Sequence, residues 1–466
     1  MKNDIYAYMR YELKHNKRIL LMLCAILFIF LPLNMLLVNE NFSNFYLISG
    51  YHTPPYYTFV KVSFIFALGL ACITPLYQFR FLYKKQMADV YFSLPMKRSH
   101  FFFMQYMTGF IEALLPFLFN YVITLLIMMV KLNNFAILIH NIPILILIIF
   151  TMMVQYALIT FVCIRCHHLF DGLIIAGMYA FVPLLIISIL ELFFMHQTSI
   201  LLNLESRDTF AFLNVLEMLL SPSSYAKNLL INEYNDMFLV YNLKSLLFTI
   251  YWLCIGLLLY RGASKYFVKY KIEACEERTN DKFTYPLMIT ISVFLMILQA
   301  FNIENQDGIL CICLAFILYF GLLFFAQRKV KVTIKQCLVL VGLFVISYGT
   351  GVVFQATNGF GLVYEFPNVN TVEDAYLMIS INETFKDENY PHSLEFDDEK
   401  DIESMIDFQK EAKKHKEQAY EYHHELYFYY NLKNGGRMMR AYNLDDLKDD
   451  AWLKQFIEDH SSYVFD

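Results

Sequence analysis

The first 356 residues alternate between long apolar runs and short polar segments. Each apolar run is long enough for an α-helix to cross the roughly 30 Å hydrocarbon core of a bilayer, which takes about 20 residues. We identify about nine such runs by this criterion. They occupy residues 19–38, 57–77, 101–130, 142–164, 173–194, 243–260, 283–301, 309–326 and 334–354. The pattern therefore predicts a polytopic α-helical membrane protein.

Residues 1–18 show helical spacing instead of a continuous apolar run. Ile5, Tyr8, Met9 and Leu13 recur on one face, and Lys and Arg residues surround them. This pattern is typical of an amphipathic helix that lies at the cytoplasmic surface of a membrane. The apolar run that follows has no small-residue cleavage site, so we expect a retained anchor.

Residues 357–466 contain no run long enough to cross a membrane. Alternating apolar positions predict a strand at 375–381, and the segment 425–444 predicts a hairpin about an Asn-Gly-Gly turn. Helical spacing recurs at 401–418 and 446–458. We therefore predict a small α+β domain at the C-terminus.

Composition separates these two parts of the chain. Hydrophobic residues make up 58% of the sequence and charged residues only 17%, whereas soluble domains carry about 25% charged residues. Residues 357–466 hold 24 Asp and Glu against 11 Lys and Arg, a net charge of −13, and the rest of the chain carries +8. The overall charge of −5 thus combines a basic membrane part with an acidic C-terminal part.

The distribution of Lys and Arg indicates the orientation. Most basic residues outside the termini fall in alternate connections, at 78–100, 165–172, 261–282 and 327–333. The connections at 39–56 and 302–308, on the other side, contain none. Because basic loops remain in the cytoplasm, we expect a cytoplasmic N-terminus. An odd number of spans then makes the C-terminal domain extracellular.

The chain carries no motif for nucleotide binding or catalysis. It lacks the G-x-x-x-x-G-K-[ST] P-loop, and no pattern places a nucleophile beside a base, so we expect it not to be an enzyme. The segment from Cys163 to His167 matches the haem-attachment pattern C-x-x-C-H. The predicted orientation places that segment in the cytoplasm, whereas c-type haem is attached on the outer side. We therefore expect no cofactor and no metal on this chain.

One charged residue lies well inside an apolar run. Glu112 falls a third of the way into the run 101–130, and Pro116 and Asn120 lie near the same helical face. A charge in the bilayer costs roughly 2.5–3.5 kcal/mol, so such a residue is a default functional candidate. An interior polar contact at a helix or subunit interface, a substrate-path or gating role, or a position at the lipid edge would explain Glu112. The run is too long to cross upright, so we expect it to be tilted, kinked near Pro116 or extended beyond the bilayer.

The polar segment 80–100 separates two strongly apolar runs and reads RFLYKKQMADVYFSLPMKRSH. We expect a short helix whose apolar residues Met87, Val90, Tyr91 and Leu94 form a knob for a partner protein, while basic residues hold it at the membrane surface. Alternatively, these basic residues serve topology alone. The candidate coupling residues are Met87, Asp89, Val90, Tyr91, Ser93, Leu94, Pro95, Lys97 and Arg98.

The sequence Ser-Leu-Pro-Met-Lys-Arg at 93–98 follows a short helix and precedes a long third run. Together with the N-terminal amphipathic helix, this arrangement resembles bacterial ABC transporter permeases of the type-2 exporter class. In that class the elbow between the second and third spans docks on the ATPase subunit. The resemblance implies a six-span core over 19–270 with a coupling elbow at 80–100, and an outer re-entrant segment at 210–220.

The remainder resembles a Gram-positive subgroup of these permeases with three additional spans, here 271–356, and an extracellular C-terminal domain. The segment YFYYNLKNGGRMMRAY at 427–442 carries this part of the resemblance. The resemblance implies the permease subunit of an exporter in a bacterial plasma membrane. Its expected partners are P-loop ATPase subunits that bind ATP and Mg, a second permease copy or paralogue, and the lipid bilayer, with no nucleic acid.

The expected substrate is amphipathic, such as an antimicrobial peptide or a lipid. A function of a different class is also open. The chain could be a non-transporting membrane sensor or signal transmitter whose outer domain binds a ligand.

Overall fold

The computed structural model describes residues 2–37, 55–132, 136–197, 216, 218–231, 243–275, 285–300, 305–357, 366–381, 394–412, 424–433, 437–443 and 451–460. The chain divides into two compact units. The first comprises Met1–Leu184, Glu217–Ile289 and Leu322–Val330, and the second comprises Leu185–Leu216, Thr290–Gly321 and Lys331–Asp466. The domain limits at 270 and 356 stay predictions.

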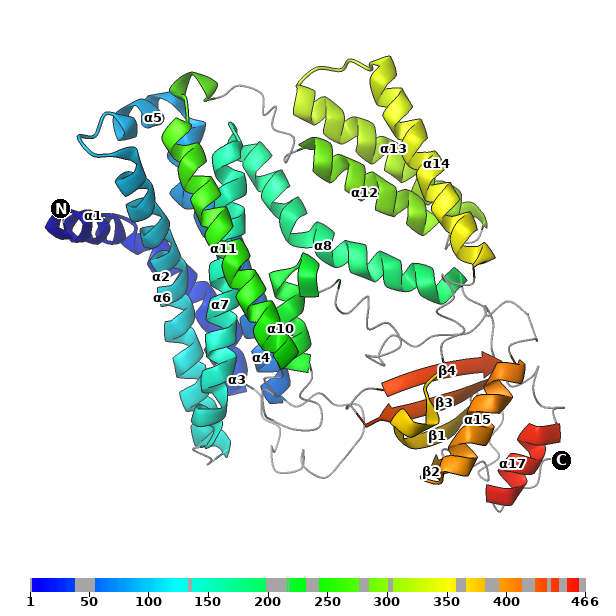
Figure 1. Cartoon of the computed structure of the whole chain (residues 1–466). Helices are drawn as coiled ribbons and strands as arrows, with labels where there is room; N and C mark the ends of the chain where they lie inside the picture. Colours follow the sequence, from blue (N-terminus) through cyan, green and yellow to red (C-terminus); the bar gives the residue numbers. More distant parts are fainter. Residues whose placement is uncertain are drawn as a thin grey trace. The chain divides into compact units, whose positions relative to one another are not determined.

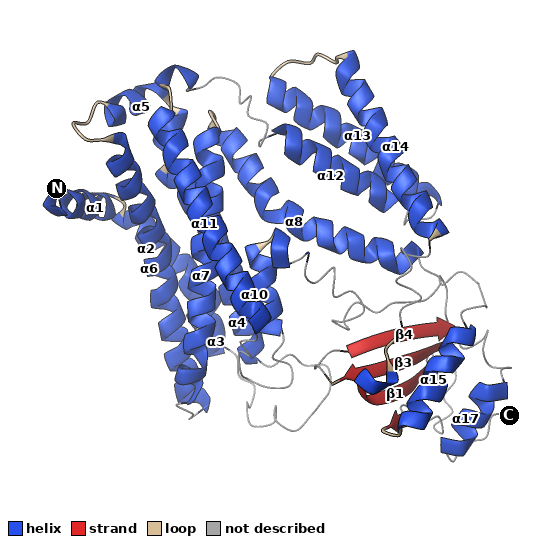
Figure 2. Cartoon of the chain, viewed as in Figure 1, coloured by secondary structure: helices blue, strands red, loops and turns tan. Residues whose placement is uncertain are grey.

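Helices make up nearly all of the described N-terminal part of the chain (Figures 1 and 2). The chain begins with α1 (Lys2–His15), α2 (Lys17–Phe28), the π-helical turn η1 (Ile29–Leu33), α3 (Asn34–Leu37) and α4 (Pro55–Gln78). It continues with η3 (Arg80–Tyr83), α5 (Lys85–Phe92), α6 (Arg98–Leu132), α7 (Ala136–Arg165) and α8 (Leu169–Gln197). The later helices are α10 (Pro222–Ile231), α11 (Leu243–Lys269), η5 (Ile272–Ala274), α12 (Tyr285–Ala300), α13 (Asn305–Gln327) and α14 (Ile334–Ala356).

Among the described residues, seven helices are long and apolar enough to cross a membrane. They cover Lys17–Leu37, Phe59–Gln78, Arg98–Lys131, Asn141–Arg165, Leu246–Lys269, Gly308–Gln327 and Ile334–Phe354. This finding agrees with the predicted polytopic helical class. Two further predicted runs lie on α8 and α12, where the apolar stretches Leu169–Ala180 and Tyr285–Ala300 are shorter. The total of nine spans stays a prediction.

Several predicted segments lie wholly or partly outside the described residues. Most of the predicted re-entrant segment 210–220 is among them, although 218–220 are helical. The predicted amphipathic helix at the N-terminus is confirmed as helical by α1.

Helix α6 packs closely against α4 and α7 at Gly109. A Cβ atom added to Gly109 would clash with the Tyr156 hydroxyl oxygen and lie 2.9 Å from Gln78 Cγ. Glycine at this position therefore permits close packing of the three helices.

Replacing Gly109 by alanine should lower stability by about 1–3 kcal/mol, because it overpacks this contact. Gly69→Ala is the matched control, since nothing lies within 4 Å of a Cβ atom there. Thermal unfolding in detergent, followed by tryptophan fluorescence, measures both variants. Equal melting temperatures for the two variants would mean that the close approach at Gly109 is unimportant.

The described C-terminal residues include one four-stranded sheet with the order β2-β1-β3-β4. The strands are β1 (Val372–Ile381), β2 (Leu394–Phe396), β3 (His424–Leu432) and β4 (Arg437–Asn443), and neighbouring strands are antiparallel. The predicted first strand and hairpin are confirmed, with Glu425 opposite Asn443 and Asn431 opposite Arg437. The Asn-Gly-Gly turn between them lies outside the described residues.

Two helices, α15 (Glu399–Ala412) and α17 (Ala451–His460), share a hydrophobic core with this sheet. Leu377 and Phe428 of the sheet are buried with Met405 of α15 in that core. Leu298 of α12 and Phe354 of α14 belong to the same buried cluster. The sheet and parts of these two apolar helices therefore share one core within the second unit.

Candidate functional site at the elbow

The elbow between α4 and α6 consists of η3 and α5, and lies across the end of the helical bundle where α6 begins (Figure 1). Its inward-facing residues are apolar and almost fully buried. Phe81, Leu82 and Ala88 are at most 2% exposed. Burial of these side chains holds the elbow against the bundle.

Phe81 lies within a cluster of aromatic rings. Its ring centroid is 4.6 Å from that of Tyr91, 5.7 Å from Phe101 and 6.3 Å from Phe267. Aromatic pairs of this kind contribute about 0.5–1.5 kcal/mol beyond the burial of their area. Because the partner rings come from α5, α6 and α11, the cluster joins the elbow to two long helices.

The four apolar residues predicted to form a knob differ in their exposure. Met87 is 40% exposed and Val90 66% exposed, so these two present apolar surface outward. Tyr91 and Leu94 pack against the hydrophobic core instead, and burial raises the pKa of the Tyr91 hydroxyl. Tyr91 and Leu94 are therefore only partly available to a partner, because the elbow rests on the bundle and these two side chains pack against it. The coupling role of the four residues stays a prediction.

The polar candidates surround the exposed pair. Asp89, Ser93, Pro95 and Lys97 are all exposed. Ser93 Oγ donates a hydrogen bond to the carbonyl oxygen of Val90 at 2.8 Å, at the end of α5. The outward face of the elbow therefore combines a small apolar surface with charged side chains.

Arg98 connects the elbow to the end of α11. Its Nη1 donates hydrogen bonds to the carbonyl oxygens of Tyr270 at 2.9 Å and Val268 at 3.2 Å. Its guanidinium also lies 4.5 Å from the ring centroid of Phe92 in α5. A cation is favourable at the C-terminus of a helix, where backbone carbonyls lack partners. Arg98 is therefore part of an internal connection.

Helix α6 runs parallel to the first apolar helix in a constant register. Hydrogen bonds link residues 95 or 96 positions apart all along the contact. Asn16 Nδ2 donates to Glu112 Oε1 at 2.8 Å, Asn120 Nδ2 to the carbonyl oxygen of Cys24 at 3.2 Å, and Lys131 Nζ to those of Met35 and Leu36 at 2.8 and 2.9 Å.

This register shows where Glu112 lies relative to the first apolar helix. Its partner Asn16 directly precedes the first apolar helix, so Glu112 is level with the beginning of that helix. From Glu112 to Lys131, α6 rises about 28 Å, close to the roughly 30 Å hydrocarbon core. Residues 98–111 add about 21 Å of helix beyond this level. Glu112 is thus level with the beginning of the apolar stretch Lys17–Leu37, and residues 98–111 of α6 precede that level. That α6 is tilted, kinked or extended beyond a bilayer stays a prediction.

A partly buried polar network connects α1 to the bundle. Tyr8 donates to Glu12 Oε1 at 2.7 Å and accepts from Gln105 Nε2 at 2.6 Å. Gln78 Nε2 in turn donates to Gln105 Oε1. Burial, and the hydrogen bond to Glu12, raise the pKa of Tyr8. The amphipathic helix is thus connected to α4 and α6 through polar side chains.

The two polar candidates predicted within the membrane, Glu112 and Asn120, form hydrogen bonds with Asn16 and with Cys24 of the first apolar helix. Tyr77 donates to Asn16 Oδ1 at 3.1 Å, which adds α4 to the contact with Glu112. Asn120 Nδ2 also donates to the carbonyl oxygen of Pro116 at 2.8 Å. Of the readings considered for Glu112, these bonds support the interior polar contact.

Replacing Glu112 by leucine should destabilise the protein by about 1–3 kcal/mol, because the buried Asn16 amide loses its acceptor. Glu112→Gln keeps an acceptor oxygen in place and should retain most of the stability. Thermal unfolding of the purified variants in detergent tests this expectation. A leucine variant as stable as the wild type would show that the Asn16 bond contributes nothing.

The C-x-x-C-H segment is part of the packing at the end of α7. Cys163 and Cys166 are fully buried, and the Arg165 guanidinium lies 4.2 and 4.0 Å from the ring centroids of Phe161 and Tyr266. Within the described parts of the chain, no group of three or more His, Cys, Asp and Glu side chains is placed to hold a metal ion.

Sequence reasoning missed the residues that support the elbow from α11. Tyr270 donates to the carbonyl oxygen of Leu82 at 3.0 Å, and Phe267 packs against Phe81. The aromatic residues at 266, 267 and 270, which follow an apolar run, are the sequence signal that could have indicated this support.

Comparison with protein-family models, curated proteins and solved structures finds no match to this chain.

Proposed function

We propose that this chain is the permease subunit of an ATP-driven exporter. The observation that carries the proposal is the two-sided elbow, which exposes Met87 and Val90 outward while its inner side is held on α6 and α11. Such a surface suits docking of a partner, since apolar side chains contribute most when a protein interface buries them. The partner in this proposal is a P-loop ATPase that binds ATP and Mg.

The contacts around the elbow suggest how force would reach the membrane helices. A push on α5 acts on α6 through the chain itself, and on α11 through Arg98 and Phe267. Residues 98–111 form a helical lever of about 21 Å above the level of Glu112. Closure of two ATPases on ATP would then move these helices as rigid bodies.

The proposal includes a location and a cargo. The elbow faces the cytoplasm of a bacterial cell, the C-terminal sheet lies outside, and a second permease copy or paralogue completes the complex. Exposed Lys84, Lys85 and Lys97 at the elbow support this orientation, because basic segments stay on the cytoplasmic side. The cargo is an amphipathic molecule such as an antimicrobial peptide or a lipid.

Reconstitution tests the proposal. The chain is purified with candidate P-loop ATPases, placed in proteoliposomes and assayed for ATP hydrolysis with amphipathic peptides and lipids. We expect a stable complex whose hydrolysis rises with one class of substrate. A chain that binds no ATPase, or a complex that never moves a substrate, would contradict the proposal.

A membrane sensor is the second candidate. The hydrophobic core that joins the C-terminal sheet to Leu298 and Phe354 favours it, because a ligand on the sheet could act on two apolar helices through that core. Isolation of a complex with a histidine kinase and without an ATPase would support the sensor instead.

A further inference from the structure

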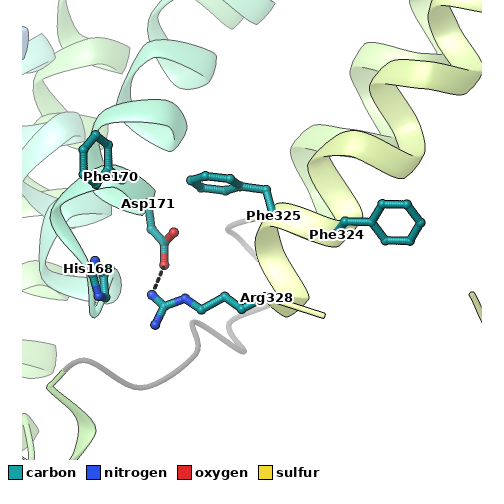
Figure 3. Close-up of a pocket in the computed structure, with 6 residues that line it drawn as sticks. All are labelled: His168, Phe170, Asp171, Phe324, Phe325 and Arg328. Atoms are coloured by element: carbon teal, nitrogen blue, oxygen red, sulfur yellow. Dashed lines mark ion pairs between the residues drawn. The ribbon is translucent and has the colours of Figure 1, made fainter. Parts of the chain in front are cut away.

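A pocket of about 450 Å³ lies in the first unit, between the beginning of α8 and the end of α13 (Figure 3). The residues that line it are His168, Phe170, Asp171, Phe324, Phe325 and Arg328. The elbow does not use this pocket. Its lining combines aromatic rings with an acid, a guanidinium and an imidazole.

A buried acid holds the cationic group in place. Asp171 is 4% exposed, and its Oδ1 accepts a hydrogen bond from the Tyr285 hydroxyl at 2.8 Å. Arg328 Nη2 lies 3.5 Å from Asp171 Oδ2. Figure 3 shows the Arg328 side chain extended toward Asp171, with the ring of Phe325 turned toward the same side. Arg328 itself remains exposed, so its guanidinium is both positioned and accessible.

The other side of the pocket is apolar and open. Phe170 is 64% exposed and Phe325 is 42% exposed. The apolar stretch of α13 ends at Gln327, one residue before Arg328. In a membrane-embedded chain, Arg328 would therefore lie where the hydrocarbon layer meets the headgroups, with the aromatic rings available to acyl chains.

We propose that this pocket binds an anionic phospholipid. The phosphate lies against the Arg328 guanidinium, whose planar fork suits phosphate oxygens. The part of the acyl chains nearest the headgroup contacts Phe170 and Phe325. Basic pockets between membrane helices bind anionic headgroups for the same electrostatic reason. This inference needs membrane embedding alone and is independent of any ATPase.

Lipid binding to the full-length protein tests the inference. Protein purified in a neutral detergent is titrated with phosphatidylglycerol, phosphatidylcholine or inorganic phosphate, and binding is followed by native mass spectrometry and thermal shift. We expect phosphatidylglycerol to bind and to raise the melting temperature, with little effect from the other two. Equal binding of phosphatidylcholine, or saturation by inorganic phosphate alone, would overturn the proposal.

Variants assign the lipid to this pocket. Arg328→Gln should weaken phosphatidylglycerol binding by at least about fivefold, whereas Lys329→Gln, at an exposed neighbour that does not line the pocket, should not. Phe170→Ser leaves the Asp171–Arg328 pair intact, and should also weaken binding. This variant decides the question if Arg328→Gln fails to fold, and unchanged binding to it would then refute the pocket.

Discussion

Replacing Val90 by aspartate should abolish association with the ATPase while leaving the membrane part folded. Val90 is 66% exposed, so an aspartate there stays hydrated in the free protein. Docking would bury that carboxylate against an apolar cleft, at a cost above about 2 kcal/mol, or roughly 30-fold in affinity. Co-purification with the ATPase, together with gel filtration of the variant, measures both consequences. Met87→Asp should act in the same direction.

The matched control is the same valine-to-aspartate substitution at an exposed position outside the elbow. Val332 is an exposed valine between α13 and α14, and Val332→Asp should leave the complex intact. Aspartate at Tyr91 or Leu94 would be a poor test, because both pack against the core and their loss would disturb the elbow itself. If Val90→Asp co-purifies with the ATPase as the wild type does, the exposed pair is not the docking surface.

Replacing Arg98 by glutamine should separate ATPase binding from transport. The variant keeps Met87 and Val90 exposed, but it loses the guanidinium that bonds to the carbonyl oxygens of Val268 and Tyr270. We expect the ATPase to remain bound while substrate stimulation of hydrolysis falls by about tenfold, as expected when about 1.4 kcal/mol of coupling is lost. Hydrolysis in proteoliposomes with and without substrate measures this effect.

Lys269→Gln is the matched control, because it removes an exposed cation from the last turn of α11, outside the elbow. It should preserve both binding and stimulation. Arg98→Lys should be intermediate, since one ammonium cannot reproduce the geometry of the guanidinium. Loss of ATPase binding in Arg98→Gln would instead make Arg98 a docking residue, and normal stimulation would exclude a role in coupling.

Much of the secondary structure could be predicted because its signals are local. The long apolar runs correspond to helices, and the alternation around Asn-Gly-Gly marked the hairpin whose strands pair Glu425 with Asn443. These patterns involve neighbouring residues, and they need no knowledge of what packs against them. The short helix at Lys85–Phe92 was also predictable from its position between two apolar runs.

The orientation of side chains at the site depended on distant residues. Tyr91 packs against the rings of Phe81 and Phe101. Phe81 in turn contacts Phe267, which lies far along the sequence. Glu112 looked intramembrane from its position in a run. Its level became clear only from the register that pairs it with Asn16. Spacing within one segment contains no information about such registers between segments.

Photo-crosslinking at Met87 tests the central claim most directly. Met87 is exposed on the outward face of α5, so a benzophenone amino acid at this position would lie within the proposed interface. The adduct formed in living cells is identified by mass spectrometry. Our account predicts a crosslink to a P-loop ATPase; crosslinks only to lipid, or to a protein without a P-loop, would contradict it.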